Sequence, residues 1–208
     1  SNVIKEKTLT YTRYNELPDF SAMTAANVQF GLIGAGVAIS NGNKMINNNN
    51  IRDPAVAIAQ ELAKMLSDEH NVTVTHNDLT VSKKAKIKDV VQVYKDYDVI
   101  WDVKTTGWGS VYYSSDWNNY KVMYNAHARL IDKNTNEVIA QHLCSSAPEY
   151  SESDDAPSYE DLERGIALEK ELTKSIEYCV EHIRKAAKLY QDKSYTKNAS
   201  LSRNTSGI

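Results

Sequence analysis

Three polar side chains form the best catalytic arrangement that the sequence offers. Apolar and polar residues alternate over 98–106 and 117–131, which is typical of half-buried β-strands. The polar faces carry Asp102 on one strand and His127 and Arg129 on the other. A histidine beside a carboxylate could serve as the general base of a hydrolase. The same residues are also typical of an exposed sheet face with cross-strand charge pairs, and we expect this second, structural role.

The other patterns that could do chemistry are incomplete. Asp98 and Asp102 place two carboxylates on one strand face, where we again expect a polar sheet surface rather than acid–base catalysis. Gly31, Gly34 and Gly36 do not match the dinucleotide-binding fingerprint, and we expect them to allow close helix packing or contact with a membrane surface. The five histidines lack the spacing of a helical metal site, so we expect neither a metal nor a cofactor.

The two cysteines are predicted to pair. Cys144 ends the predicted strand 137–144, and Cys179 lies on the apolar stripe of a long helix that includes Leu172 and Ile183. Because a strand end and a packed helix face can meet, we predict a Cys144–Cys179 disulfide and therefore an oxidising compartment. The alternative is two separate buried thiols.

An aromatic segment gives the best candidate binding surface. It is expected to lie at or near a hairpin tip and contains Trp108, Tyr112, Tyr113, Trp117 and Tyr120. Exposed aromatic rings at a loop can bind a sugar ring or a partner protein. The alternative is that several of these rings fold back onto the core.

Changes in hydrophobic period predict the elements that position these residues. We expect a short apolar helix at 28–40, an Asn-rich loop at 41–50, helices at 54–68, at 83–95 and after Ser158, and strands at 3–13, 72–75, 98–106, 117–131 and 137–144. The strands have one buried and one polar face, so we predict an α+β fold, an antiparallel-rich sheet with helices packed on one face. Residues 1–190 are expected to form a single domain and residues 191–208 a disordered tail.

Composition and charge argue against a nucleic-acid-binding protein and against a membrane-spanning segment. The chain has 208 residues and a net charge of −3, and its basic residues form no cluster that fits nucleic-acid binding. Its longest apolar run is about half of the roughly 18 residues that cross a bilayer.

One segment resembles a family. Residues 128–140 resemble a strand–turn–strand of many bacterial envelope lipoproteins, with Leu130-x-Asp132 before the turn and Glu137-Val138 after it. Asn136 stands where glycine is commoner. The acidic loop 146–157 and Cys179 also look like a group of uncharacterised proteobacterial lipoproteins.

The order of elements is more distantly similar to the curli-secretion lipoprotein and to outer-membrane lipoproteins that activate penicillin-binding proteins. This resemblance implies a periplasmic location, a lipid anchor on a cysteine before residue 1, and a binding or assembly role. It implies no catalytic residues, and the long membrane-inserting hairpins of a secretion pore are not evident in the sequence.

We therefore predict a non-enzymatic periplasmic or outer-membrane-associated protein that binds an envelope partner protein or a cell-wall component. Membrane contact is expected only through a lipid anchor outside residues 1–208. Two alternatives stay open: a carbohydrate-binding module that uses the hairpin 108–120, and a hydrolase that uses His127 and Asp102. The sequence defines neither the ligand nor the oligomeric state.

Overall fold

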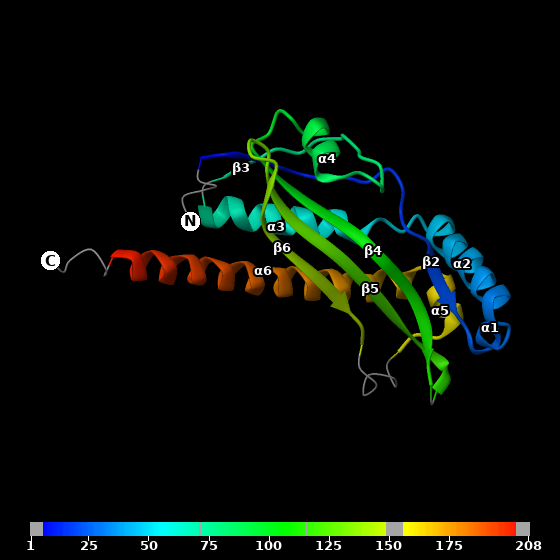
Figure 1. Ribbon diagram of the computed structural model, residues 1–208. Coiled ribbons are helices and arrows are strands. Elements are labelled where there is room, and N and C mark those ends of the chain that lie inside the picture. The colour runs from blue at the N-terminus through cyan, green and yellow to red at the C-terminus, as the bar shows by residue number, and fades with distance from the viewer. Residues whose placement is uncertain (1–5, 71, 115, 149–155, 203–208) are drawn as a thin grey trace.

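A mixed six-stranded sheet organises the chain (Figure 1). The computed structural model describes residues 6–70, 72–114, 116–148 and 156–202, with side chains described up to residue 186. The strands are β1 (Thr8–Tyr11), β2 (Phe20–Met23), β3 (Thr73–Val74), β4 (Val99–Tyr113), β5 (Asp116–Asp132) and β6 (Glu137–Ser146). Their order is β3-β1-β4-β5-β6, and β2 also pairs with β4.

The sheet is α+β in class but is not antiparallel-rich. The strands β4, β5 and β6 form the predicted antiparallel meander, whereas β1 and β2 both run parallel to β4. Leu9 pairs with Val99 and Phe20 pairs with Trp108, so β1 and β2 follow one another along the same edge of β4. Because the chain does not reverse between β1 and β2, both strands have the same direction relative to β4.

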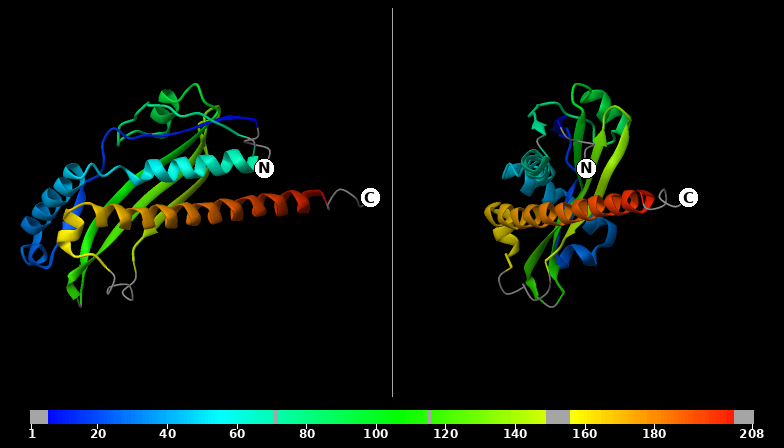
Figure 2. Two further views of the ribbon diagram at one scale, coloured as in Figure 1. Left: turned by 180° about the vertical axis from the view of Figure 1, so that it is seen from behind. Right: turned by 90° about the vertical axis from the view of Figure 1, so that its left-hand side faces the viewer.

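The helices lie on both faces of the sheet. They are α1 (Ala25–Gln29), α2 (Gly31–Asn48), α3 (Pro54–His70), α4 (Ile87–Val93), α5 (Tyr159–Glu163) and α6 (Ile166–Ser202). Helices α3 and α6 cover one face, as Figure 2 shows, and their apolar side chains pack into the main core. Helix α4 lies on the opposite face, where Val90 and Tyr94 pack against Ile100 and Ile131. The prediction that helices cover one face is therefore wrong at this end of the sheet.

Helix α2 is longer than the sequence predicts. The stretch 41–50, expected as a loop because of its asparagines, continues the helix to Asn48. Its Gly42, Met45 and Ile46 are buried, so tertiary packing overrides the weak helix propensity of Asn and Gly. Asn49 then ends the helix, with its side chain bonded to the carbonyl oxygens of Met45 and Glu163.

The alternation of β5 is confirmed. The side chains of Tyr120, Val122, Tyr124, Ala126, Ala128 and Leu130 are buried in the main core. The residues between them, from Lys121 to Arg129, are only partly buried and form the other face. Burial of the apolar side chains from β4 and β5 against α3 and α6 is the main favourable contribution to folding.

The predicted disulfide is confirmed. Cys144 of β6 and Cys179 of α6 are bonded, with a Cα–Cα distance of 5.5 Å, and both are buried. On α6, Cys179 shares its buried stripe with Leu168, Leu172 and Ile183. The bond therefore fixes the last strand of the sheet to the helix that covers it.

The predicted tail, residues 191–208, lies where no side chain is described, and it stays a prediction together with the single domain over 1–190. Within the described part of the chain, none of the helices combines the length and the apolar character needed to cross a membrane.

We predict that the double variant Cys144→Ala/Cys179→Ala folds but loses stability. Removing the bond restores loop freedom to the unfolded chain, so the free energy of unfolding should fall by about 2–4 kcal/mol. Urea denaturation of the oxidised wild type and the variant measures this difference. An unchanged midpoint and slope would contradict a stabilising role for the bond.

Candidate functional site

Asp102 is a structural carboxylate at the centre of the sheet. Its side chain is 1% exposed, and its Oδ2 accepts hydrogen bonds from Nε of Arg129, at 2.9 Å, and from Nη2 of the same side chain. Its Oδ1 accepts from the hydroxyl of Tyr14 at 2.6 Å and from Oγ1 of Thr12 at 3.1 Å. Both oxygens are thus occupied, and the ion pair joins β4, β5 and the segment that follows β1.

His127 does not complete a catalytic pair. The register places Arg129 opposite Asp102, whereas His127 lies opposite Lys104 on β4 and opposite Leu143 on β6. Burial and the neighbouring Asp102 carboxylate raise the pKa of Tyr14, which keeps its hydroxyl protonated as a donor. The carboxylate is therefore held by donors and is not directed at the histidine.

Asp98 also has a structural role. Its Oδ2 accepts hydrogen bonds from the backbone N of Thr8, at 2.9 Å, and from Oγ1 of Thr8, at 2.8 Å. These bonds stabilise the charged form and lower the pKa of Asp98. Asp98 and Asp102, which the sequence pattern placed on one strand face, therefore each stabilise a different contact between strands, and they do not act as a pair.

Three of the five aromatic candidates pack into the core. Trp108 is buried with its ring edge-on to Phe20 at 5.4 Å, and its Nε1 donates to the carbonyl oxygen of Pro18 at 2.9 Å. Tyr113 and Tyr120 are also buried. Trp108 thus packs against β2, and all three rings have little exposed surface for a ligand.

Trp117 remains exposed and is held in position. Its side chain is 60% exposed, its Nε1 donates to the carbonyl oxygen of Ser114 at 3.1 Å, and the half-buried Tyr112 ring meets it edge-on at 6.2 Å. Beside it, Asp116 accepts hydrogen bonds from the Asn118 backbone and the Asn119 side chain. The β4–β5 hairpin therefore presents one ordered indole and one tyrosine at its tip.

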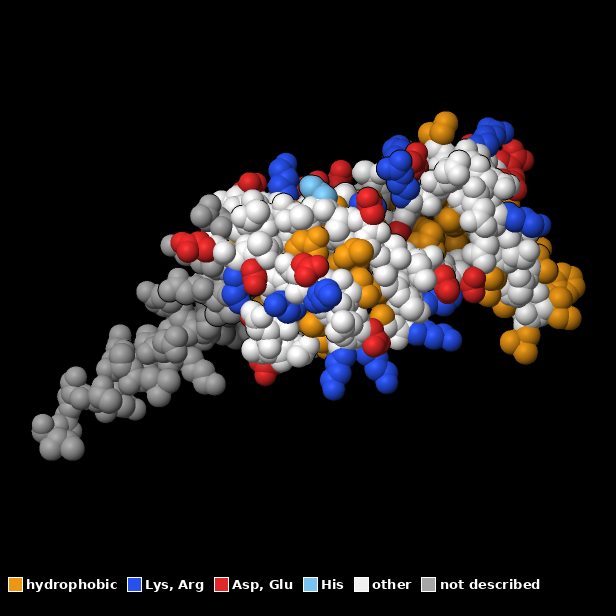
Figure 3. Space-filling view, turned by 90° about the horizontal axis from the view of Figure 1, so that it is seen from above, with side chains coloured by type: hydrophobic (Ala, Val, Ile, Leu, Met, Phe, Trp, Pro, Cys, Tyr) orange, Lys and Arg blue, Asp and Glu red, His pale blue; other side chains and the backbone are white. Residues whose placement is uncertain are grey.

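A second exposed surface, which the sequence reasoning missed, lies at the junction of α1 and α2. We call it the apolar tip; it consists of the exposed side chains of Val28, Phe30, Leu32, Ile33, Val37 and Ile39. Figure 3 shows hydrophobic side chains projecting from the end of the molecule where these helices lie. Runs of exposed apolar residues are unfavourable in water, and in natural proteins they mark surfaces that contact a partner, a ligand or a membrane.

The packing of α2 explains why these large side chains point outward. Its first turns bury small residues, Gly34, Ala38 and Gly42, at a spacing of four. A Cβ at Gly34 would lie 1.7 Å from the carbonyl oxygen of Asn27, and one at Gly42 would lie 2.1 Å from that of Phe20. The backbone contacts therefore fix the small face inward. Of the three glycines that were predicted to allow close helix packing or contact with a membrane surface, Gly34 packs closely, whereas a Cβ at Gly31 or Gly36 would meet nothing within 4 Å.

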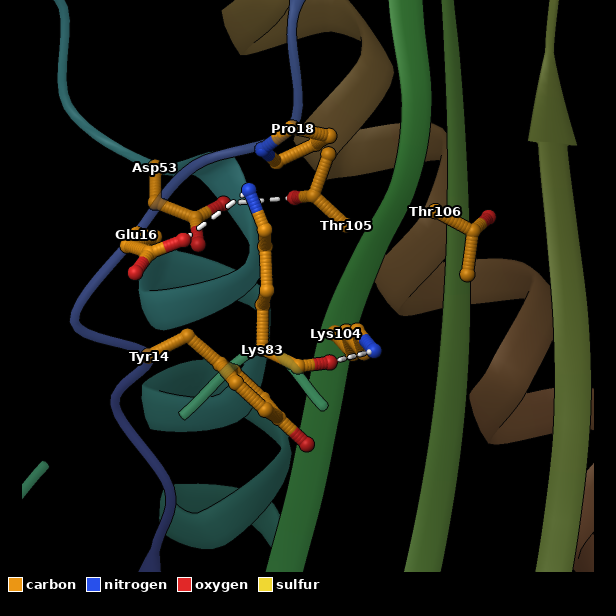
Figure 4. A pocket seen from close by; sticks show the side chains of 8 residues that line it. All are labelled: Tyr14, Glu16, Pro18, Asp53, Lys83, Lys104, Thr105 and Thr106. Carbon is orange, nitrogen blue, oxygen red and sulfur yellow. Dashed lines mark hydrogen bonds and ion pairs between the residues drawn. The ribbon is translucent and has the colours of Figure 1, made fainter. Parts of the chain in front are cut away.

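A cavity of about 260 Å³ opens where the edge of β4 passes between its pairings with β1 and β2 (Figure 4). Its charged side chains are engaged with neighbours. Lys83 pairs with Glu16 at 2.9 Å, and Lys104 Nζ donates to the carbonyl oxygen of Lys83. Asp53 Oδ1 accepts from the Ala55 backbone and from Thr105 Oγ1, while burial raises the pKa of Asp53. The Lys83, Lys104 and Asp53 side chains of this cavity are therefore each held by a neighbouring group.

In the described part of the chain, no three side chains of the metal-binding types come together. The expectation of no metal and no cofactor stays a prediction.

Comparisons with known proteins give only remote likenesses. No family model matches the chain, and no curated protein matches it. Among solved structures, lipoprotein GNA1162 from Neisseria meningitidis is 12% identical, with a TM-score of 0.37, over 78% of this chain and 94% of its own. A DUF330 protein from Xanthomonas campestris is 12% identical, with a TM-score of 0.44, over 92% of this chain and 89% of its own. The LpoB C-terminal domain from Salmonella enterica is 9% identical, with a TM-score of 0.31, over 68% of this chain and 83% of its own. These neighbours include bacterial lipoproteins, but identities and scores this low define no family.

We predict that Asp102→Ala destabilises the fold strongly whereas His127→Ala does not. Loss of the carboxylate leaves the largely buried Arg129 guanidinium unpaired, which should cost about 3–5 kcal/mol of unfolding free energy. His127→Ala should stay within about 0.5 kcal/mol of wild type, because His127 is only partly buried. Urea denaturation measures both. Equal, small effects of the two substitutions would contradict the structural role of Asp102.

Proposed function

We propose that this chain is a non-enzymatic protein of the bacterial envelope, periplasmic or attached to the outer membrane, that binds a partner protein or a cell-wall component. The observation that carries the proposal is the β4–β5 hairpin, where Trp117 is exposed and yet held by Ser114 and Tyr112. A rigid aromatic anchor loses little conformational entropy on binding, which is typical of binding hot spots.

The disulfide supports an envelope location. Structural disulfides form and persist in oxidising compartments such as the periplasm. The β5–β6 turn is also consistent with the lipoprotein resemblance. Asp132 Oδ1 accepts from the backbone N of Asn134 at 2.8 Å and of Thr135 at 3.4 Å, and Asn136 takes a left-handed φ of 58° where glycine is commoner.

The state of Asp102 supports a binding role over a hydrolase. Both of its oxygens accept hydrogen bonds from Arg129, Tyr14 and Thr12, and His127 has other neighbours in the register. The pair that the hydrolase alternative needs is therefore not assembled.

A carbohydrate-binding module is the second candidate. The exposed indole of Trp117 beside Tyr112 is the feature that favours it, because sugar rings stack on such aromatic faces. A glycan array separates this candidate from binding of a protein. Saccharide binding that requires Trp117 would favour the module.

We predict that Trp117→Ala weakens binding at least about tenfold without unfolding the protein, since an exposed hot-spot tryptophan typically contributes 2 kcal/mol or more. Two assays cover the two classes of ligand. Co-sedimentation with purified peptidoglycan sacculi tests the cell wall, and photo-crosslinking from the exposed position 118 in living cells tests a protein partner.

Leu143→Ala is the matched control, because Leu143 is also a largely exposed apolar residue and lies on β6, away from the hairpin. Unchanged sacculus binding and an unchanged crosslinking pattern in Trp117→Ala would contradict the role of the hairpin.

A further inference from the structure

Six exposed hydrophobic side chains fall within twelve consecutive positions of the apolar tip, residues 28–39. The exposure is extreme at the turn between the helices, where Leu32 is 92%, Ile33 77% and Phe30 67% exposed. The buried face of α2 is fixed by Gly34 and Gly42, so no rotation of the helix can hide these side chains. The exposed tip is thus fixed by the packing of α2.

The tip is convex. Gly31 has a φ of +53° and turns the chain sharply from α1 into α2, and a Cβ at this position would meet nothing within 4 Å. A convex corner buries little surface against a flat protein face or against a second copy of itself. A lipid bilayer, in contrast, is fluid, so a convex apolar surface can insert into it and bury all of its apolar side chains.

Charge also distinguishes this segment from the rest of the chain. The chain has 27 acidic residues, yet none occurs between Asp19 and Asp53, where the only charged residues are Lys44 and Arg52. On α2, Ile33, Val37, Ser40 and Lys44 follow at spacings of four, three and four and therefore share one face. That face is apolar near the turn and basic two turns later, and Lys44 is exposed.

We infer that the apolar tip inserts into the surface of a phospholipid bilayer that contains anionic lipid. The side chains of Phe30, Leu32 and Ile33 enter the boundary between headgroups and acyl chains, and Lys44 meets the headgroup phosphates. The absence of acidic residues lets α1 and α2 approach the anionic surface without repulsion. This contact goes beyond the proposed function, because it uses no residue of the β4–β5 hairpin.

Sedimentation with vesicles of phosphatidylethanolamine and phosphatidylglycerol tests the inference. Wild-type protein should pellet with the vesicles, and Leu32→Ser/Ile33→Ser should lower the partition coefficient at least about tenfold, because both side chains supply buried apolar area. Leu143→Ser, at an exposed leucine on β6, is the matched control and should bind as wild type. Thermal melts followed by circular dichroism check that each variant is folded.

Insertion itself can be followed with one indole. In a Trp117→Phe background the remaining tryptophans, Trp101 and Trp108, are buried, so Phe30→Trp places a single exposed indole at the tip. Its emission should shift to shorter wavelength on vesicle addition and should be quenched by brominated lipid.

Three results would overturn the inference. The first is that wild type does not pellet with vesicles, or that the Leu32→Ser/Ile33→Ser variant pellets equally well. The second is a wild-type dimer in sedimentation velocity that the double variant converts to monomer, which would assign the tip to a second copy. The third is that Trp117→Ala loses vesicle binding while the Leu32→Ser/Ile33→Ser variant retains it.

A different result would contradict only the proposed function. In that case wild type binds neither sacculi nor a partner through Trp117, but vesicle binding is normal.

Discussion

The antiparallel pairing of β4 with β5 is the constraint on which the other elements depend. It extends from the pair Val99–Asp132 to the pair Tyr113–Asp116. Strands β1 and β2 pair with β4, β6 pairs with β5, and β3 adds to β1. One face of this ladder supplies most of the main core, and the opposite face carries the buried Asp102–Arg129 pair. Because Asp102 also binds Tyr14 and Thr12, the ion pair draws the segment after β1 onto the ladder. The charged cluster is best understood as part of the architecture.

Sequence reasoning succeeded where side-chain period alone decides the outcome. The alternation in 117–131 identified both faces of β5, and the helical stripe around Cys179 led to the disulfide. It failed where the tertiary environment decides. The Asn-rich stretch 41–50 is helical because Gly42 and Met45 pack inward, and β1 and β2 run parallel to β4 because of a chain path that local pattern does not encode.

The candidate site was predicted only in part, because tertiary contacts decide which of its residues are exposed. Aromatic residues mark a hairpin, but composition does not say which rings face the core, and the burial of Trp108, Tyr113 and Tyr120 depends on β2 and on neighbours distant in sequence. Trp117 and Tyr112 are what remains at the surface. The apolar tip was not among the predicted binding residues, because the sequence pattern indicated close helix packing or membrane contact without showing which side chains face outward; here the small residues pack inward and the large ones do not. Figures 1 and 2 place α1 and the β4–β5 hairpin at the same end of the molecule, so the two proposed surfaces belong to one end of the fold.

The bond between Cys144 and Cys179 also changes what a cut in the chain would do. The two cysteines are 35 residues apart, and the segment between them contains the connection from β6 to α5. A protease that cleaved within the connection from β6 to α5 would produce two fragments that stay covalently joined, and α6 would keep its core contacts through Leu172 and Ile183. A cut in that connection would therefore leave a two-chain protein whose second fragment stays bound to the sheet through the disulfide.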